Sequence, residues 1–248
     1  AGFDMAAAGT SLGVDGAWQA ALAYSLQLYF DFSSYSDMAL GLGALFGFDL
    51  PLNFDNPYRA KSIREFWRRW HMSLSRFLRD YVYIPMGGSR QGAARMVAVA
   101  VFTMLLCGLW HGAGWTFIAW GGMHGLAVCC NRLWMATPWR MPAIAGWAIT
   151  LFFVVIGWVL FRAADFGVAM DLVTAMFGFG EGGEADTEDW RLVVFGLGFA
   201  LLGPTNVELS RMRWIAQRLV AVPLGLLMVA TIMRVGQGRG LEFIYFQF

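Results

Sequence analysis

The sequence predicts an all-α, polytopic membrane protein, a bundle of transmembrane helices, and three observations lead to this prediction. The 248 residues are 58% hydrophobic and only 14% charged, whereas a soluble domain is nearer half apolar and a quarter charged. Several apolar segments have about the 20-residue length that a helix needs to cross a bilayer. The basic residues gather in loops between those segments. These features exclude a disordered chain, a coiled coil and an ordinary soluble enzyme.

Five apolar segments are candidates for membrane spans. They are residues 17–48, 96–131, 143–161, 192–207 and 219–233. The segment 143–161 is the most uniformly apolar, and 192–207 and 219–233 are shorter. The first segment contains Asp31 and Asp37, whose carboxylates are costly in lipid unless they find partners. We expect these two residues to pack against Arg side chains or backbone donors rather than to act in catalysis.

The segment 96–131 is too long for one crossing. Its 36 residues carry no Asp, Glu, Lys or Arg, and as one helix they would reach about 54 Å, against a hydrocarbon core of about 30 Å. Three glycines, Gly108, Gly112 and Gly114, surround His111 near its middle. We therefore expect a broken helix, a hairpin or a re-entrant loop that bends near His111. Each leg would then be a little short of a crossing, with His111 inside the membrane.

The charge distribution gives an orientation. Nine of the 18 Lys and Arg residues lie within residues 59–95, and residues 163–190 are acidic. Because Lys and Arg are retained on the cytoplasmic side, the basic loops are expected in the cytoplasm and the acidic loop outside. The chain is thus predicted to be a multi-pass membrane protein.

The basic segment 62–82 has the pattern of an amphipathic helix. Apolar side chains recur at intervals of three and four, with Arg residues opposite them, and Ser62 with Glu65 forms a capping box at its start. We expect this helix to lie in the membrane plane, against lipid. Its Arg side chains could also meet a phosphate-bearing donor. A nucleic-acid partner is not expected.

The three histidines do not form a metal site. His71, His111 and His124 are 40 and 13 positions apart, and no metal-binding spacing connects them. An ionisable side chain at membrane depth indicates a functional site, so His111 is a candidate general base. His124 is a weaker candidate, for which helix packing is the simpler interpretation.

Three stretches of the sequence resemble the membrane-bound O-acyltransferases and, within that family, the membrane components of alginate O-acetylation. The stretches are LQLYFDFSSYSDMALGLGALFGFDLPLNFDNPY, SIREFWRRWHMSLSRFLRDYVYIPMGGSR and LLCGLWHGAGWTFIAWGGMHGL. They cover most of residues 26–126, and the end of the chain, EFIYFQF, is also similar. Family members are about twice this long. The resemblance therefore implies that residues 1–248 are a single membrane domain, the C-terminal half of a longer chain.

The resemblance implies acyl transfer through a helical bundle with a central tunnel. His111 matches the family's essential histidine, and His71 matches a second conserved polar position. A cytoplasmic thioester donor, acetyl-CoA or an acyl carrier, supplies the acyl group, and no cofactor is bound. The acceptor is a hydroxyl of an exported polysaccharide such as alginate, reached through periplasmic partner proteins. Within the family, teichoic acid, peptidoglycan or cellulose are alternative acceptors.

The remaining expectations concern the substrates and the rival functions. The oxyanion donor could be His71 or backbone N–H groups. The residues expected to contact substrates are Asp37, Arg68, Arg69, Trp70, Trp110, Trp115 and His124. The first rival is a transporter or channel lined by Asp31, Asp37 and His111. The second is a structural subunit that only scaffolds a secretion complex.

Overall fold

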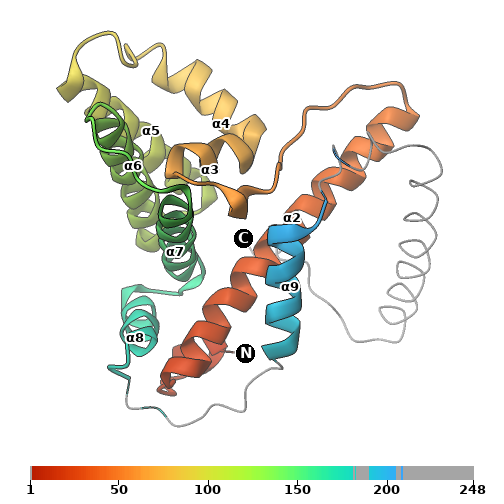
Figure 1. Ribbon diagram of the computed structural model, residues 1–248, viewed down its shortest axis with the longest axis vertical. Helices are drawn as coiled ribbons and strands as arrows, with labels where there is room; N and C mark the ends of the chain where they lie inside the picture. The colour runs from red at the N-terminus through yellow and green to blue at the C-terminus, as the bar shows by residue number, and fades with distance from the viewer. Residues whose placement is uncertain (1, 181, 183–189, 205–207, 209–248) are drawn as a thin grey trace. The chain divides into compact units, whose positions relative to one another are not determined.

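The computed structural model describes residues 2–180, 182, 190–204 and 208, and every regular element within them is a helix (Figure 1). The elements are α1 (Gly2–Ala7), α2 (Val14–Leu45), the 3₁₀ turn η1 (Pro57–Arg59), α3 (Ile63–Arg69), α4 (Met72–Leu78), the π-helical turn η2 (Arg79–Tyr83), α5 (Ala93–His111), α6 (Trp115–Met135), α7 (Ala143–Arg162), α8 (Phe166–Met176) and α9 (Trp190–Leu202). The chain divides into two units, residues 1–201 and 202–248. Everything below concerns the first unit. The predicted span 219–233 and the C-terminal string 242–248 lie outside the described residues.

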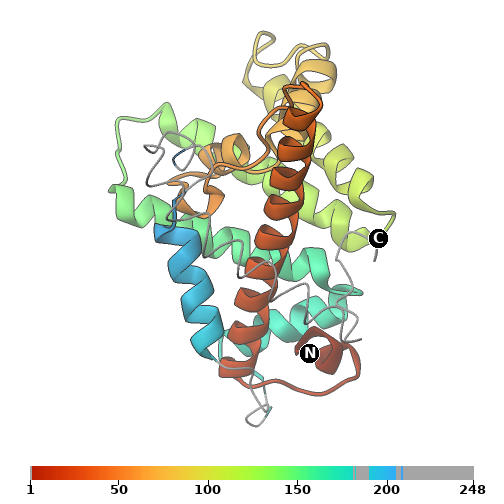
Figure 2. The ribbon, with the colours of Figure 1, turned by 90° about the vertical axis from the view of Figure 1, so that its right-hand side faces the viewer.

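Two of the described helices, α5 and α7, are long and apolar enough to cross a membrane. Helix α7 covers the predicted span 143–161 and extends it by one residue. Helix α2 is a single helix of 32 residues that passes through Asp31 and Asp37 without a break, and it is continuous in both views (Figure 1, Figure 2). The predicted segment 192–207 falls on α9, whose 13 residues are too few for a full crossing of about 20.

The apolar segment 96–131 is divided between α5 and α6, with the break at residues 112–114. At a rise of 1.5 Å per residue the two helices are about 28 Å and 31 Å long. These legs are longer than the sequence led us to expect, since each is close to the thickness of the hydrocarbon core. His111 lies at the C-terminal end of α5, and Arg95 lies near its N-terminal end.

Glycines bring the two helices of this hairpin into backbone contact. A Cβ atom at Gly108 would overlap the carbonyl oxygen of Phe117, and one at Gly121 would overlap the carbonyl oxygen of Met104. Small residues at such positions allow helices in a membrane to approach closely, where dispersion contacts replace the hydrophobic effect. The α5–α6 hairpin is thus held together by close packing along much of its length.

The amphipathic segment 62–82 does not form the single helix that we expected. It divides into α3, α4 and η2, and the break between α3 and α4 is at Trp70 and His71. Trp70 is extended, and His71 has a left-handed backbone with φ +40°. The loop that contains Asn53 and Asp55 takes up backbone groups that a continuous helix would use. The N–H of Asp55 donates to the carbonyl of Arg69 (3.0 Å), and the N–H of Met72 donates to the carbonyl of Asn53 (3.0 Å).

The start of α3 follows the sequence closely. Ser62 accepts a hydrogen bond from the N–H of Glu65 at 3.2 Å, as the capping box predicts. The Glu65 carboxylate accepts from the N–H of Lys61 at 2.8 Å rather than from the N-cap residue itself. These bonds fix where the chain enters α3.

The break between α3 and α4 turns Trp70 into an aromatic core. The Trp70 ring stacks on Phe66 at 5.6 Å between centroids, meets the edge of Phe54 at 5.1 Å, and packs on Trp158 of α7 at 4.9 Å. Only 4% of Trp70 is exposed. Helix α3 is therefore packed into the protein along α6 and α7, and not only against a lipid surface.

Candidate active site

His111 is the last residue of α5, where the helix stops before three small residues. Its half-buried ring packs against Trp110 (4.9 Å between centroids), Trp120 (5.4 Å, perpendicular) and Phe161 (5.0 Å). A Cβ atom at Gly112 would come within 2.6 Å of the Phe117 ring. Glycine at this position therefore lets the chain turn tightly beside His111.

His71 reaches the same place from the junction of α3 and α4. Its buried ring meets Phe32 of α2 edge to face, at 4.7 Å between centroids, and lies 6.1 Å from the ring of Trp110. Burial lowers the pKa of His71 from 6.5 to about 4. The imidazole of His71 is consequently neutral at pH 7, so that one ring nitrogen can donate and the other can accept a hydrogen bond.

Trp110 thus connects the two histidines that the sequence singled out. They are 40 positions apart in the chain, yet both of their rings contact this one indole. The left-handed backbone of His71 matters here, because it ends α3 and directs the chain back into α4. Non-glycine residues rarely adopt this conformation, and it often occurs where function requires a particular side-chain position.

His124 lies one layer deeper than the other two. It is completely buried on α6 between Trp120 (4.8 Å between centroids) and Phe153 (5.1 Å). Its Nδ1 accepts a hydrogen bond from the indole N–H of Trp67 at 3.2 Å, and its Nε2 has no hydrogen-bond partner. Trp120 contacts both His111 and His124, so it separates the candidate base from this inner ring. Contact of His124 with a substrate stays a prediction.

The predicted substrate-contacting tryptophans are spread over different environments. Trp70 is part of the aromatic core and lies between Phe66 and Trp158. Trp110 is 59% exposed beside the two histidines, whereas Trp115, at the start of α6, is 74% exposed. The structure therefore brings Trp110 to His71 and His111 and leaves Trp115 on the surface.

Arg68 and Arg69, both predicted to contact a substrate, also lie in different environments. Arg69 is held by the protein itself: its guanidinium lies 2.9 Å from Glu65 and 3.7 Å from the carboxylate of Asp55, and it donates to the Asp55 carbonyl at 3.1 Å. Arg68 is exposed. Arg69 therefore connects α3 to the loop before it, and Arg68 is the one that presents its charge to the surroundings.

Asp37 lies on α2, five residues beyond Phe32, the residue that touches His71. At 1.5 Å per residue this is about 7 Å along the helix. Asp31 lies one residue before Phe32 and is half-buried. In the part of the chain that the structure describes, no group of three or more His, Cys, Asp or Glu side chains is placed to hold a metal ion.

Trp120 is the site residue that the sequence did not reveal. It packs against His111, His124, Trp158 and Phe161. The signal was available, because Trp120 and His124 are four residues apart on one helix and residues at that spacing are neighbours. Phe161 could not have been found in this way, since its contact with His111 joins two different helices.

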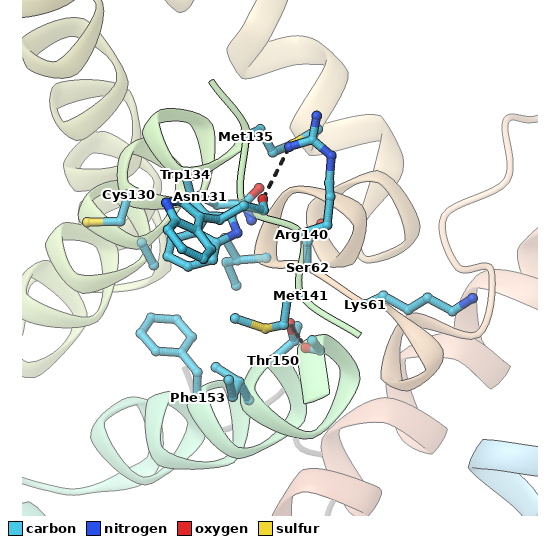
Figure 3. A pocket seen from close by; sticks show the side chains of 15 residues that line it. Lys61, Ser62, Cys130, Asn131, Trp134, Met135, Arg140, Met141, Thr150 and Phe153 are labelled. Carbon is cyan, nitrogen blue, oxygen red and sulfur yellow. Dashed lines mark hydrogen bonds between the residues drawn. The ribbon is translucent and has the colours of Figure 1, made fainter. Parts of the chain in front are cut away.

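One pocket in the described part of the chain lies away from the histidines. It has a volume of about 580 Å³ and lies between the start of α3, the end of α6 and the start of α7. Figure 3 shows Asn131 and Trp134 of α6 facing Phe153 and Thr150 of α7 across it. No histidine lines it. We therefore place the candidate site at His71 and His111, and not at this pocket.

Comparison with known proteins identifies the family. The sequence profile of the membrane-bound O-acyltransferase (MBOAT) family matches residues 7–164. The chain belongs to the MBOAT family. Among its relatives is the peptidoglycan O-acetyltransferase of Helicobacter pylori, 46% identical over 181 residues, which are 71% of this chain and 34% of the relative.

Two further relatives have related names. The probable alginate O-acetylase AlgI of Azotobacter vinelandii is 44% identical over 210 residues, 84% of this chain and 42% of the relative. The teichoic acid D-alanyltransferase of Streptococcus thermophilus is 37% identical over 120 residues, 45% of this chain and 29% of the relative. The matched part of the chain thus covers between 29% and 42% of the length of these relatives. The matched region of the MBOAT profile includes all three histidines.

Proposed function

We propose that this chain belongs to a membrane O-acyltransferase that transfers an acyl group, most simply acetyl, from a cytoplasmic thioester across the membrane toward the hydroxyls of an exported polysaccharide. The observation that carries the proposal is the meeting of His111 and His71 at Trp110, in a chain of the MBOAT family. Relatives named for peptidoglycan, alginate and teichoic acid support a polymer as the acceptor.

His111 is the general base in this proposal. Its imidazole removes the proton of the acceptor hydroxyl while the hydroxyl oxygen attacks the thioester carbonyl. The carbon–sulfur bond then breaks, and the thiolate takes the proton back from the imidazolium. General-base assistance of this kind contributes roughly 10²–10⁴-fold to a rate. The products are an ester and a free thiol.

His71 is the proposed supporting residue. Because it is neutral at pH 7, its N–H can donate a hydrogen bond to the oxygen that gains negative charge as the tetrahedral intermediate forms. Backbone N–H groups at the break between α5 and α6 are the alternative donors. Arg68, Trp110 and Trp115 are proposed to contact the substrates, together with Asp37, Arg69, Trp70 and His124.

The proposed orientation places the basic loops in the cytoplasm of a bacterium, with the chain in its inner membrane. The donor, acetyl-CoA or an acyl carrier, then approaches from the cytoplasmic side through a tunnel, and periplasmic proteins pass the acyl group to the polymer. The alternative acceptors within the MBOAT family are teichoic acid, peptidoglycan and cellulose.

The test is His111→Ala in the full-length protein, with two measurements: consumption of acetyl thioester by isolated membranes, and acetyl content of the secreted polymer. We expect both to fall by about 10²-fold or more, with the protein still inserted. Cys130→Ala is the control, because Cys130 is exposed and lines the pocket that contains no histidine. Unchanged acetylation with His111→Ala would favour a scaffold, and a donor-independent flux lost with His111→Ala would favour a transporter.

A further inference from the structure

A second pocket, of about 250 Å³, lies between the α3–α4 segment and the α5–α6 hairpin. Three arginines from three different elements line it: Arg64 of α3, Arg79 of η2 and Arg132 of α6. We call it the arginine pocket. None of its lining residues is Asp or Glu. Its charged wall is therefore entirely positive.

Two of the three guanidinium groups retain free hydrogen-bonding capacity. Arg64 contacts only the sulfur of Met135, at 3.4 Å, which is a weak acceptor. Arg132 reaches the hydroxyl of Tyr83 at 3.5 Å. Within the described residues neither has a carboxylate partner. Arg79 differs, because it is paired with Asp80 at 2.7 Å.

The positive charges of this pocket repel one another. Burial lowers the pKa of Arg64, and the charges of Arg68 and Arg132 lower it further. Arginine stays protonated at any physiological pH, so these guanidinium groups repel one another throughout that range. An anion between Arg64 and Arg132 would replace this repulsion with attraction, and a planar guanidinium matches the geometry of phosphate oxygens.

The apolar part of the lining follows one face of α5. Met96, Ala100 and Met104 recur every four residues along it, and Val128 of α6 completes the wall. A ligand of this pocket therefore combines an anionic head with a chain that lies against methyl and thioether groups. Seven residues separate Met104 from His111, which is about 10 Å along the helix.

The larger pocket of Figure 3 lacks this combination. The amino group of Lys61 points away from it, and Arg140 donates to the carbonyls of Thr137 (2.7 Å) and Trp139 (3.2 Å). Its cations are thus either directed outward or already bonded. The arginine pocket is the one in which guanidinium groups line the cavity with donors to spare.

We propose that the arginine pocket binds a phosphate group carried on an extended chain, with Arg64 and Arg132 as its principal ligands. Two molecules offer this chemistry in a membrane: an anionic phospholipid, and a phosphate-bearing thioester donor such as a coenzyme A ester. The pocket's chemistry does not depend on the proposed acyl transfer, so binding can be measured separately from activity.

The experiment measures binding to the full-length protein in neutral detergent micelles by calorimetric titration. One arm titrates a short-chain phosphatidylglycerol, and the other titrates coenzyme A. The variants are Arg64→Gln and Arg132→Gln, with Arg76→Gln as the matched control. Arg76 is exposed on α4, outside the pocket, and donates only to the Met72 carbonyl of its own segment at 3.3 Å. All three variants remove one positive charge.

We expect Arg64→Gln and Arg132→Gln each to weaken binding by about tenfold or more, because the loss of one hydrogen bond between charged groups changes an affinity by about that factor. Arg76→Gln should stay within about twofold of the wild type. Ala100→Leu, which narrows the pocket without changing its charge, should also weaken binding. Gel filtration and thermal unfolding in the same detergent verify that each variant is folded.

The two arms identify the source of the phosphate. Saturable binding of phosphatidylglycerol alone makes this a lipid site, and binding of coenzyme A alone makes it a donor site. The proposal is overturned if the wild type binds neither ligand, if the two pocket variants bind as the wild type does, or if Arg76→Gln weakens binding equally.

Discussion

The indole N–H of Trp67 donates a hydrogen bond to Nδ1 of His124, with 3.2 Å between the two nitrogens. Because an indole nitrogen can only donate, Nδ1 must carry a lone pair, and the neutral ring then has its proton on Nε2. That nitrogen faces α7 where Gly157 leaves room: a Cβ atom at Gly157 would lie 3.0 Å from it. The bond therefore fixes both the tautomer and the orientation of a fully buried histidine.

Trp67→Phe is expected to destabilise the protein by about 1–3 kcal/mol, because it leaves a buried acceptor without a partner. The measurement is thermal unfolding in detergent. The double variant Trp67→Phe/His124→Leu should lose less than the sum of the two single variants, since removing both partners leaves no unsatisfied group. An additive double variant would show that the hydrogen bond does not contribute.

Gly121→Ala is expected to destabilise the α5–α6 hairpin by about 1–3 kcal/mol, since its new methyl group overlaps the Met104 carbonyl oxygen. Gly122→Ala is the control one position away. There the new Cβ meets only the flexible side chain of Leu105, at 3.3 Å. Equal unfolding temperatures for the two variants would contradict close backbone packing as the source of the hairpin's stability.

The stability of the protein is expected to depend on pH through His71. Its pKa is about 4 in the folded protein against an ordinary value of 6.5. The unfolded chain therefore binds a proton between these values that the folded chain does not bind. His71 therefore contributes about 3 kcal/mol to the free energy of unfolding. This contribution is complete above pH 6.5 and is lost as the pH falls from 6.5 to 4.

His71→Asn tests this dependence, because asparagine tolerates the left-handed backbone better than most residues do. Unfolding temperatures measured between pH 4 and pH 7.5 should vary less for the variant than for the wild type. If the two proteins show parallel pH profiles, the neutral state of His71 is not what stabilises the fold at neutral pH.

Arg69→Gln separates a structural role from substrate binding. Its contacts with Glu65 and Asp55 predict a loss of about 1 kcal/mol of stability. If Arg69 acts only through these contacts, the KM for the thioester donor should stay unchanged. The exposed Arg68, changed to Gln, should leave stability unchanged. A raised KM for Arg69→Gln at unchanged stability would instead assign Arg69 to the donor.

Hydropathy and helix-capping residues predicted much of the helical organisation. The span 143–161 differs from α7 by one residue, and the capping residue Ser62 begins α3 as its spacing with Glu65 predicts. Such features are local, because length, apolar character and capping are properties of neighbouring residues. The limits of α2 also lie close to the apolar segment 17–48.

The break at His71 could not be read from the sequence. The periodic pattern of residues 62–82 favours one helix, but the backbone of Asn53 and Asp55 captures hydrogen bonds at its centre. That competition arises between segments about 17 positions apart, so no local pattern reveals it. The same is true of Trp120 and Phe161, whose contacts with His111 depend on how three helices pack.

The glycine contacts between α5 and α6 also restrict how this protein can move. Helices that touch through their main chains cannot slide past each other, because every shift drives carbonyl oxygens into Cα atoms. The hairpin is therefore expected to move as one rigid body, so that α5 and α6 keep their spacing beside His111.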